Sequence, residues 1–349
     1  MQDKEKINIL LTGDIMLGGN LNNPLCEKGF DFPFKPLSSY YAVSDIVFGN
    51  LEAPLSCDGV PQKSKILLHQ NSRTSAGLKG AGYDIFSIAN NHIMDYGEDA
   101  LIKTIDILEE HGLEHVGAGA NISQATKPVE FLKKGVRINF LAYASSTTDE
   151  SNPLISAGEH NAGVALLDIR NIKEDINALR KKHADIIAVS LHWGLDKYHY
   201  PLPEQIGWAH EIIDAGANII IGHHSHCLQA VEIYKKGIIA YSLGNFVFGD
   251  FLLLNGNMNR WTKRNRATAL LRVTIAKEEV MDYEIIPVFV NGNGQLRVLK
   301  GLKRQKMLKS ITEWSDAVKD PFYGKNYRKR VRKEKISIFF EKIASKLRI

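Results

Sequence analysis

The chain has 349 residues, of which 44% are hydrophobic and 24% are charged, and its formal net charge is +5. This length allows one large domain or two modest ones, and the composition excludes a disordered or fibrous protein. No stretch approaches the roughly 20 apolar residues of a membrane span, and residues 1–6 are too charged for a signal peptide. We therefore expect a cytoplasmic protein.

The charge is distributed unevenly along the chain. Residues 297–349 contain 17 Lys/Arg and 5 Asp/Glu, whereas residues 1–296 contain 27 Lys/Arg and 34 Asp/Glu. The acidic balance of the larger part argues against nucleic-acid binding by the body of the protein. The three cysteines are widely spaced and form no zinc or disulfide pattern, which is typical of a reducing compartment.

Five apolar segments of strand length end in polar residues. They are residues 7–12, followed by Gly13-Asp14; 46–48, followed by Gly49-Asn50-Leu51-Glu52; 84–89, followed by Asn90-Asn91-His92; 185–191, followed by His192-Trp193-Gly194; and 219–221, followed by Gly222-His223-His224-Ser225-His226. Continuous apolar runs predict strands that are buried on both faces, as in sheets covered by helices. In α/β folds, ligands gather at the carboxyl ends of such strands. The pattern therefore predicts one shared site.

Other segments complete the expected elements. Helical spacing of apolar residues predicts helices over 97–111, 171–182 and 203–216. Residues 133–144 predict a hairpin strand that has its turn at Lys134-Gly135. From about residue 228 the pattern changes to strands, which are expected over 228–234, 238–243, 267–275 and 280–290. Two packed sheets flanked by helices would accommodate both parts.

The residues at the predicted strand ends suit a divalent transition metal. His224 and His226 have the His-x-His spacing that can direct two imidazoles at one ion, and imidazole is the commonest neutral ligand of such metals. Strand alternation predicts that His223 points away from both and instead packs or makes a supporting hydrogen bond. Asn90 is explained equally well as a helix cap or turn residue.

Six motifs in order resemble those of one known family. They are Gly13-Asp14-Ile15-Met16, Gly49-Asn50-Leu51-Glu52, Asn90-Asn91-His92, His192-Trp193-Gly194, Gly222-His223-His224-Ser225-His226 and Ser242-Leu243-Gly244-Asn245-Phe246. Over residues 6–290 the chain resembles the CapA family of capsule and poly-γ-glutamate synthesis proteins, which is similar to the calcineurin-like metallophosphoesterases. The resemblance implies an α/β fold, a four-layer α/β/β/α sandwich with a metal site at the carboxyl ends of the strands. It also implies a metallophosphoesterase-like domain over 1–296 and a basic extension over 297–349.

The resemblance further implies roles for individual residues. The metal-binding positions of the family match Asp14, Glu52, Asn91, His192, His224 and His226. His92 matches the histidine that protonates the leaving group in the phosphoesterases. One or two ions of Mn, Fe or Zn suit this donor set, and such ions lower the pKa of bound water to roughly 7. Substrate contact, or orientation of the ligands, is expected from Asn50, Asn90, His223 and Asn245.

Two positions depart from the phosphoesterase pattern. Met16 stands where those enzymes have a histidine, and a thioether is a poor ligand for a hard divalent ion. The second motif has its carboxylate at Glu52, two residues after Asn50, in place of an aspartate that bridges two metals. These departures favour one tight and one weak metal position.

The leading hypothesis is a metal-dependent hydrolase that cleaves a phosphoester or an amide during synthesis or processing of an anionic polymer such as poly-γ-glutamate. The alternative is a non-catalytic accessory protein that uses its metal site to bind the carboxylate-rich polymer during assembly or export, and Met16 favours it. An amidohydrolase barrel also uses His-x-His, but on its first strand, whereas here the motif comes late.

The C-terminal residues 327–349 have two interpretations. Residues 327–335 are densely basic, and apolar residues follow at helical spacing, namely Ile336, Phe339, Phe340, Ile343 and Leu347. A basic amphipathic helix can lie on an anionic membrane surface, which would make the protein peripheral at a membrane. The same pattern also describes a terminal helix that packs on the body with its charges in solvent.

Overall fold

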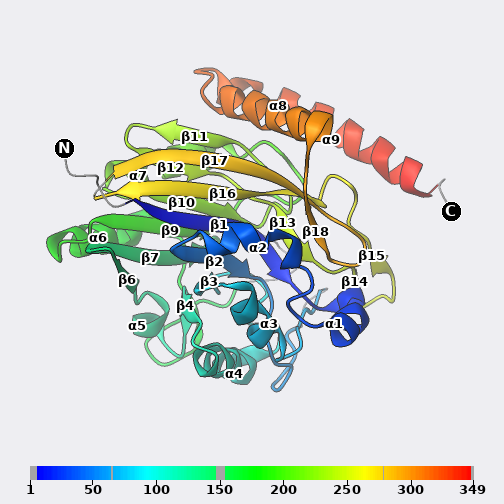
Figure 1. Ribbon diagram of the computed structural model, residues 1–349, viewed down its shortest axis with the longest axis horizontal. Coiled ribbons are helices and arrows are strands. Elements are labelled where there is room, and N and C mark those ends of the chain that lie inside the picture. The colour runs from blue at the N-terminus through cyan, green and yellow to red at the C-terminus, as the bar shows by residue number, and fades with distance from the viewer. Residues whose placement is uncertain (1–5, 64–65, 147–153, 278, 347–349) are drawn as a thin grey trace.

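Two β-sheets that pack face to face form the centre of the molecule (Figure 1). The computed structural model describes residues 6–63, 66–146, 154–277 and 279–346, with side chains up to Phe339. Across the two sheets, the rings of Phe48 and Phe140 stack with their centroids 5.5 Å apart. The core between the sheets is therefore closed by apolar side chains from both.

The first sheet carries the first three predicted strand ends. Its strand order is β18-β17-β16-β1-β2-β3-β4, and β13 also pairs with β1. Strands β1 to β4 and β13 run parallel, whereas β16, β17 and β18 are antiparallel. The bounds are β1 Ile7–Met16, β2 Ile46–Leu51, β3 Ile85–Ser87, β4 Glu114–Val116, β13 Asn245–Phe248, β16 Ala267–Ala276, β17 Glu279–Val290 and β18 Leu296–Val298.

The second sheet carries the other two predicted strand ends. Its order is β11-β12-β10-β9-β7-β6, with antiparallel strands at both edges and parallel strands between them. The bounds are β6 Val129–Lys133, β7 Val136–Ala144, β9 Ile186–His192, β10 Ile219–His223, β11 Val231–Tyr234 and β12 Gly237–Ala240. The predicted turn between β6 and β7 is confirmed, because Lys134 and Gly135 have φ values of 48° and 75°.

Alternate residues of β10 face opposite sides of the second sheet. Ile219 and Ile221 lie in the core between the sheets, whereas Ile220 lies in a second core under the helices. That second core includes Ile172 of α6 (Ile169–Lys181) and Ile212 of α7 (Pro203–Asp214). Since strand side chains alternate with a period of two, the predicted burial of these strands on both faces is confirmed.

Helices complete the outer layers of the sandwich (Figure 1). The predicted helices agree with α4, α6 and α7 to within two residues at each end. The other elements are η1 Gly19–Leu21, α1 Asn22–Lys28, η2 Lys35–Leu37, α2 Ser38–Ala42, α3 Thr74–Ala81, α4 Gly97–Glu110, β5 Ala118–Gly119, α5 Ile122–Ala125, β8 Gly163–Val164, β14 Phe251–Leu252 and β15 Met258–Asn259. The structure therefore confirms the predicted α/β class and the four-layer arrangement.

Helix α8 (Gly301–Val318) lies across the edge of the sandwich and was not predicted. It buries Ile311 and Val318, and Ser315 Oγ accepts a hydrogen bond of 3.0 Å from the backbone N–H of Val231. The expected boundary between residues 296 and 297 falls within β18, and the division into two parts stays a prediction. Within the described ranges, none of the helices combines the length and the apolar character that crossing a bilayer requires.

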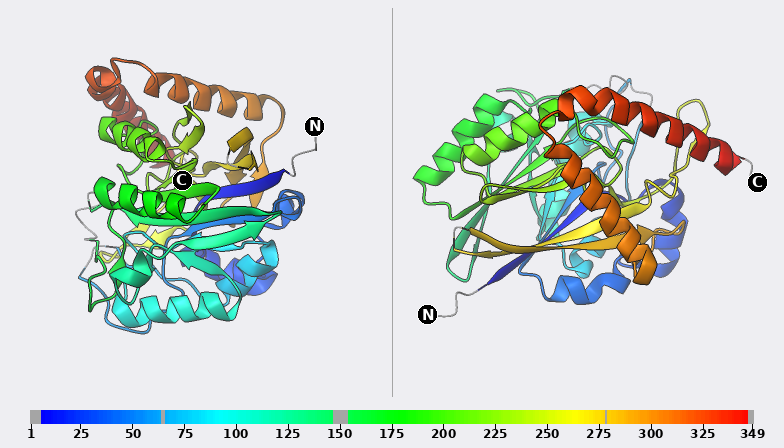
Figure 2. Two further views of the ribbon diagram at one scale, coloured as in Figure 1. Left: turned by 90° about the vertical axis from the view of Figure 1, so that its left-hand side faces the viewer. Right: turned by 90° about the horizontal axis from the view of Figure 1, so that it is seen from above.

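Helix α9 (Tyr323–Lys346) packs on the body through its first half. The hydroxyl of Tyr323 donates to the carbonyl of Pro201 at 2.7 Å, and the guanidinium of Arg330 lies over the ring of Tyr200. The second half extends past the body (Figure 2). Residues 347–349 of the expected membrane helix lie outside the described residues, and contact with a membrane stays a prediction.

Candidate metal centre

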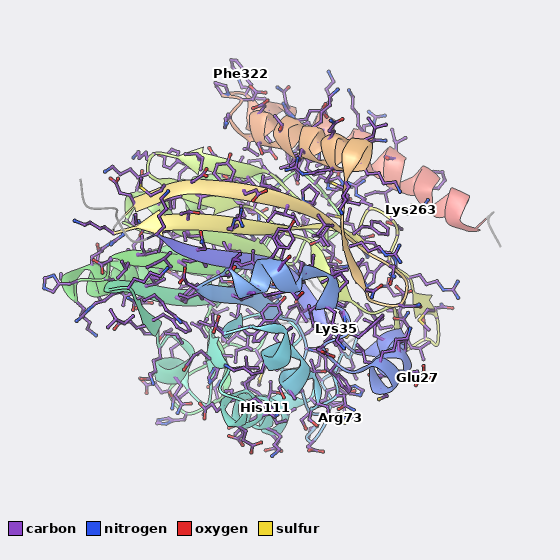
Figure 3. The ribbon with its side chains drawn as sticks, viewed as in Figure 1. Glu27, Lys35, Arg73, His111, Lys263 and Phe322 are labelled. Atoms are coloured by element: carbon purple, nitrogen blue, oxygen red, sulfur yellow. The ribbon has the colours of Figure 1, made fainter. Side chains whose placement is uncertain are left out.

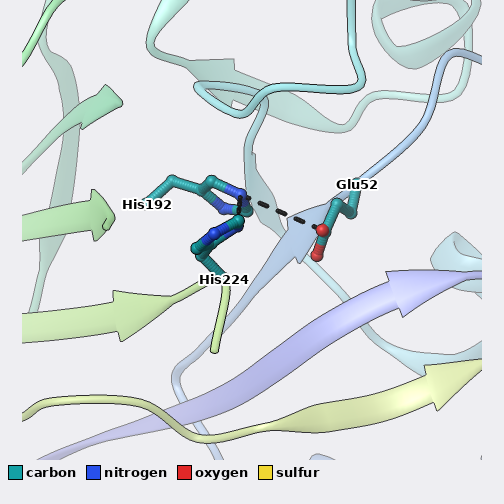
Figure 4. Close-up of side chains that lie close together, drawn as sticks. All are labelled: Glu52, His192 and His224. Atoms are coloured by element: carbon teal, nitrogen blue, oxygen red, sulfur yellow. Dashed lines mark hydrogen bonds and ion pairs between the residues drawn. The ribbon is translucent and has the colours of Figure 1, made fainter. Parts of the chain in front are cut away.

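The structure brings together buried carboxylates and imidazoles from the two sheets. Asp14 lies on β1, Glu52 follows β2, and His192 ends β9, whereas His224 and His226 follow β10. Their donor atoms form two groups within 4.8 Å, one of Glu52, His192 and His224 and one of Asp14, Glu52 and His226. Figure 4 shows the first group, in which Glu52 points toward the two imidazoles. Glu52 belongs to both groups.

Two glycines allow the strands to approach closely just before these donors. A Cβ atom on Gly13 would lie 1.9 Å from the carbonyl oxygen of Gly244, and one on Gly222 would lie 1.9 Å from that of Tyr241. No side chain fits at either distance, so only glycine permits this spacing. Each glycine directly precedes a residue of the site, namely Asp14 and His223.

The histidine segment leaves the strand conformation where it enters the site. Strand β10 ends at His223, and the next histidines have positive φ values, 87° at His224 and 52° at His226. Residues other than glycine adopt this region at a cost of roughly 1–3 kcal/mol, and such strain is concentrated at functional sites. The two side chains are therefore directed by a strained turn, and they fall into different donor groups, not side by side on one strand as expected.

One oxygen of Glu52 is the clearest sign that a cation fits here. Glu52 Oε1 is buried and has no hydrogen-bond partner among the described residues. It lies 3.6 Å from His226 Nε2 and 3.9 Å from His192 Nε2. Ligand atoms that each stand about 2.0–2.2 Å from one ion lie roughly 3–4 Å apart, so these separations suit a shared metal. A buried carboxylate oxygen without a partner is otherwise costly.

A network of hydrogen bonds orients Asp14. Asn50 Nδ2 donates to Asp14 Oδ1 at 2.9 Å and lies 3.3 Å from Glu52 Oε2. His223 Nδ1 donates to the same Asp14 oxygen at 3.0 Å, and its ring packs 6.2 Å from that of Phe48. Both residues are therefore hydrogen-bonded to the carboxylates, and a role in orienting metal ligands stays a prediction for them.

Three asparagines occupy different positions around the imidazoles. Asn91 Oδ1 lies 2.9 Å from His192 Nε2, which places it beside one of the two donor groups. Asn245 Oδ1 accepts a 2.7 Å hydrogen bond from His226 Nδ1, which leaves Nε2 directed at Glu52. Such a bond to the second ring nitrogen is usual for metal-binding histidines. Asn90 caps the turn that follows β3 by accepting from the backbone N–H of His92, and its Nδ2 donates to Asn50.

His92 lies at the edge of the site in a buried pair with Asp95. Its Nδ1 is 2.8 Å from Asp95 Oδ2, which also accepts a 2.6 Å hydrogen bond from the backbone N–H of Leu68. Burial raises the pKa of Asp95, and the charge of His92 opposes that rise. Asp95 was not predicted from the sequence, because only its spacing of three residues from His92 connects it with the site.

Asp196 is a further carboxylate that the sequence analysis missed. Its Oδ1 is buried without a hydrogen-bond partner in the part of the chain that the structure describes. This oxygen lies 3.6 Å from His224 Nε2 and 3.8 Å from His226 Nε2. Asp196 sits in the loop after His192-Trp193-Gly194, and nothing in its local pattern distinguishes it from an ordinary loop aspartate.

Burial and the mixture of charges shift the acidities of the site. Burial, followed by the charges of Asp14 and Asp196, raises the pKa of Glu52 well above its ordinary value. Burial and the neighbouring His224 lower the pKa of His192 well below its ordinary value. Burial would raise the pKa of Asp14, but the hydrogen bond and charge of His223 lower it overall. The imidazole of His192 is therefore neutral at neutral pH, the form that binds metals.

Replacement of Glu52 by glutamine is expected to stabilise the protein in the presence of a chelator and to weaken metal binding. A carboxyl whose pKa is raised by folding keeps its proton longer in the folded state, so stability falls as the pH rises above the ordinary value of 4.5. Glutamine removes this loss, and the gain at neutral pH is expected to be roughly 1–3 kcal/mol. Thermal unfolding of both proteins with chelator between acid and neutral pH measures it. If the stabilities of the two proteins change with pH in parallel, Glu52 is not the buried carboxylate with the raised pKa.

A small cavity of about 40 Å³ lies directly over the site. Its polar lining includes His92, Asp196 and His226, and its roof is apolar, formed by Ile66, Leu68, Phe248, Phe251 and Trp261. A volume of this size holds an ion or a few water molecules and no polymer unit. Met16 lies in the apolar cluster with Phe248 and Trp261, and its sulfur accepts from the backbone N–H of Gly18. Its thioether therefore belongs to the wall.

Comparison with known proteins identifies the family. Residues 8–250 match the family model described as bacterial capsule synthesis protein PGA_cap. The capsule biosynthesis protein CapA of Bacillus anthracis is 31% identical over 323 residues, which are 89% of this chain and 74% of that protein. The PGA biosynthesis protein CapA of Bacillus subtilis (strain 168) is 33% identical over 308 residues, 87% of this chain and 77% of that protein.

Among solved structures, the sulfate thiohydrolase SoxB of Thermus thermophilus aligns with a TM-score of 0.45 and 10% identity, over 81% of this chain and 46% of that one. The family match and the two relatives confirm the resemblance that the six motifs indicated. The chain belongs to the PGA_cap family of bacterial capsule synthesis proteins.

Proposed function

We propose that this protein is a metal-dependent hydrolase that acts on a phosphoester or amide during the synthesis or processing of a capsule polymer such as poly-γ-glutamate. The observation that carries the proposal is the buried Glu52 Oε1, which has no hydrogen-bond partner among the described residues and lies between imidazoles of two donor groups. The names of the Bacillus relatives, in capsule and PGA biosynthesis, support the association with an anionic polymer.

The residues that would hold the metal are Asp14, Glu52, Asn91, His192, His224 and His226, with Asp196 as an additional carboxylate. One or two ions of Mn, Fe or Zn fit this mixture of carboxylate, amide and imidazole donors. Such an ion, when bound, supplies a Lewis acid that polarises a phosphoryl or carbonyl oxygen and acidifies water. The shared Glu52 would connect two positions if two ions bind.

His92 would move the proton in this reaction. The contact between His92 Nδ1 and Asp95 fixes the orientation of the ring, and the buried carboxylate favours the protonated imidazole. The ring lines the cavity over the site, so Nε2 could deliver a proton to a leaving group there. The apolar roof of Leu68, Phe251 and Trp261 would exclude bulk water, and it would have to open for a substrate larger than the cavity.

A metal analysis of the purified protein, together with a screen of phosphoesters and γ-glutamyl peptides, tests the proposed function. We expect at least one equivalent of a transition metal and turnover of a member of one substrate class that stops when the metal is removed. Full metal loading without turnover of either class would overturn the hydrolase proposal.

The accessory function is the second candidate, and the position of Met16 favours it. Met16 lies within an apolar cluster and offers no ligand to the site. A protein of this kind would bind carboxylate-rich polymer through its metal during assembly or export. It would bind the polymer only with metal present and would turn over no substrate in the same screen.

A further inference from the structure

A second, larger cleft lies between helix α9 and the body of the protein. Its volume is about 620 Å³, within the range of roughly 300–1,000 Å³ that is typical of ligand sites. The body contributes His199, Tyr200, Arg264 and Trp314, and the helix contributes Asn326, Lys329, Arg330, Lys333, Glu334 and Ser337. In Figure 3, Lys263, the neighbour of Arg264, lies on the side of the body that α9 crosses. The cleft is separate from the metal centre.

The lining of the cleft is strongly cationic. Four cations line it, Arg264, Lys329, Arg330 and Lys333, against the single carboxylate of Glu334. Burial and the neighbouring charge of Arg264 lower the pKa of His199 to about 3, so this imidazole is neutral. The surplus of positive charge therefore remains at neutral pH and would attract an anion.

Arg264 is the buried anchor of this cleft. Its side chain is only 8% exposed, and its Nε has no hydrogen-bond partner among the described residues. It forms an ion pair with Glu334, which also accepts a 2.7 Å hydrogen bond from the backbone N–H of His199. The chain thus places one carboxylate of its own against this guanidinium, which shows the type of group that the position accepts.

The remaining cations of the cleft have unused capacity. Arg330 pairs with Asp320 through Nη2, but its Nη1 is buried without a partner in the described part of the chain. Lys329 and Lys333 are exposed, and neither joins any ion pair found between described residues. Trp314 stacks on His199 with ring centroids 4.0 Å apart and forms a rigid wall. Several anionic groups could therefore bind beside the one that Glu334 supplies.

The same two loops line the cleft and the small cavity over the metal centre. Lys197 lines the small cavity over the metal site, and His199, two residues later, lines the cleft. On the other loop, Trp261 lines the cavity and Arg264 lines the cleft. Asn265 Nδ2 donates to the carbonyl of His226 at 3.1 Å, which ties this loop to the metal-binding turn. A long ligand in the cleft would therefore lie next to the roof of the metal site.

We propose that this cleft binds a segment of the carboxylate-bearing polymer and holds it beside the metal centre. The identity of the anion rests on the proposed function, whereas the existence of an anion site rests on the cleft alone. Its spaced cations match the repeated carboxylates of a glutamate polymer better than one compact anion, because the lysines follow each other along one face of α9 at positions 329 and 333.

The test is binding of a short, fluorescently labelled γ-glutamate oligomer to the full chain by anisotropy. The charge-reversal variant Lys329→Glu/Lys333→Glu alters the cleft. The matched control, Arg328→Glu/Arg332→Glu, changes the same net charge on exposed positions of the same helix that do not line the cleft. We expect the first pair to weaken binding by roughly tenfold or more and the second by less than about threefold, since non-contacting charges act only through screened attraction.

Further binding measurements identify the ligand. A glutamine oligomer of equal length should not bind, because it lacks the charges. Equal loss in both variants would show diffuse attraction and overturn the proposal. If inorganic phosphate displaces the oligomer at a comparable concentration, the proposal that the ligand is the polymer is overturned.

If the wild type binds phosphatidylserine vesicles and does not bind the oligomer, α9 is assigned to a membrane surface instead. Lys329→Gln/Lys333→Gln serves the same purpose if charge reversal disturbs folding.

The oligomer is also measured with the chelator-treated protein. We expect binding to persist there, because no proposed metal ligand lines the cleft. One result is that the oligomer binds without metal and the cleft variants weaken that binding, while no substrate is turned over. That result would support the cleft proposal and overturn the hydrolase proposal. Loss of all oligomer binding on chelation would place the polymer on the metal and overturn the cleft proposal.

Discussion

Replacing His224 and His226 together by alanine is expected to abolish stoichiometric metal binding. The two imidazoles belong to different donor groups that share Glu52, so the double variant removes one donor from each. The carboxylates and the single imidazole of His192 would remain. Without the other two imidazoles, the site would lose most of its preference for transition metals over Mg²⁺ or Ca²⁺. Metal content by mass spectrometry of the purified protein measures the loss, and the rise in melting temperature on adding metal should vanish with it.

Two further variants keep this experiment decisive. Because both histidines have positive φ values, asparagine, which tolerates that conformation better than alanine, provides a second double variant that preserves the turn. His160→Ala, at an exposed histidine that belongs to neither donor group, serves as the control and should retain full metal. Unchanged metal content in a folded double variant would show that the ion binds elsewhere.

Replacing His92 by asparagine is expected to lower turnover by roughly 10²–10⁴-fold, the usual contribution of a general acid. The variant should keep its metal, because His92 belongs to neither group of donor atoms and its neighbour Asn91 is the residue proposed as a ligand. The measurement is kcat on the substrate that the screen identifies, with metal content determined on the same sample. His160→Asn is the matched control and should leave kcat unchanged.

A change in the pH profile would separate a chemical role of His92 from a structural one. If His92 donates the proton, the alkaline limb of the rate should disappear in His92→Asn, whereas a merely loosened site would lose rate at all pH values. Asp95→Asn should shift the same limb to lower pH, since the carboxylate that favours the protonated ring is gone. Equal rates of wild type and His92→Asn would show that another group is the acid.

The strands and their ends were predictable because burial on both faces leaves a plain pattern in the sequence. Alternate residues of β10 serve two cores, so the whole strand is apolar, and the first polar residues after it mark the edge of the sheet. For that reason Asp14, Glu52 and His192 could be named as candidate donors from the sequence alone. The five strand ends do meet, as expected of parallel strands.

Asp196 and Asp95 could not be predicted in the same way. Each lies in a loop, and its approach to the site depends on how that loop returns, which no periodicity records. Helix α8 was not predicted because only Ile311, Ser315 and Val318 are buried along its length, and these are too few for a clear apolar stripe. The His-x-His spacing suggested a strand geometry, whereas the chain uses a left-handed turn to separate the two imidazoles.

The close approach at Gly13 and Gly222 has a consequence for how this site can be lost during evolution. Neither residue offers a functional group, yet a single methyl at either would meet the carbonyl oxygen of an adjacent segment, Gly244 or Tyr241, and push the backbone outward. Asp14 and His223 stand on the very next positions and would move with it. A related sequence could thus retain every candidate donor and still have lost the geometry of the site, so counting the candidate ligands alone would overestimate how many related sequences keep it.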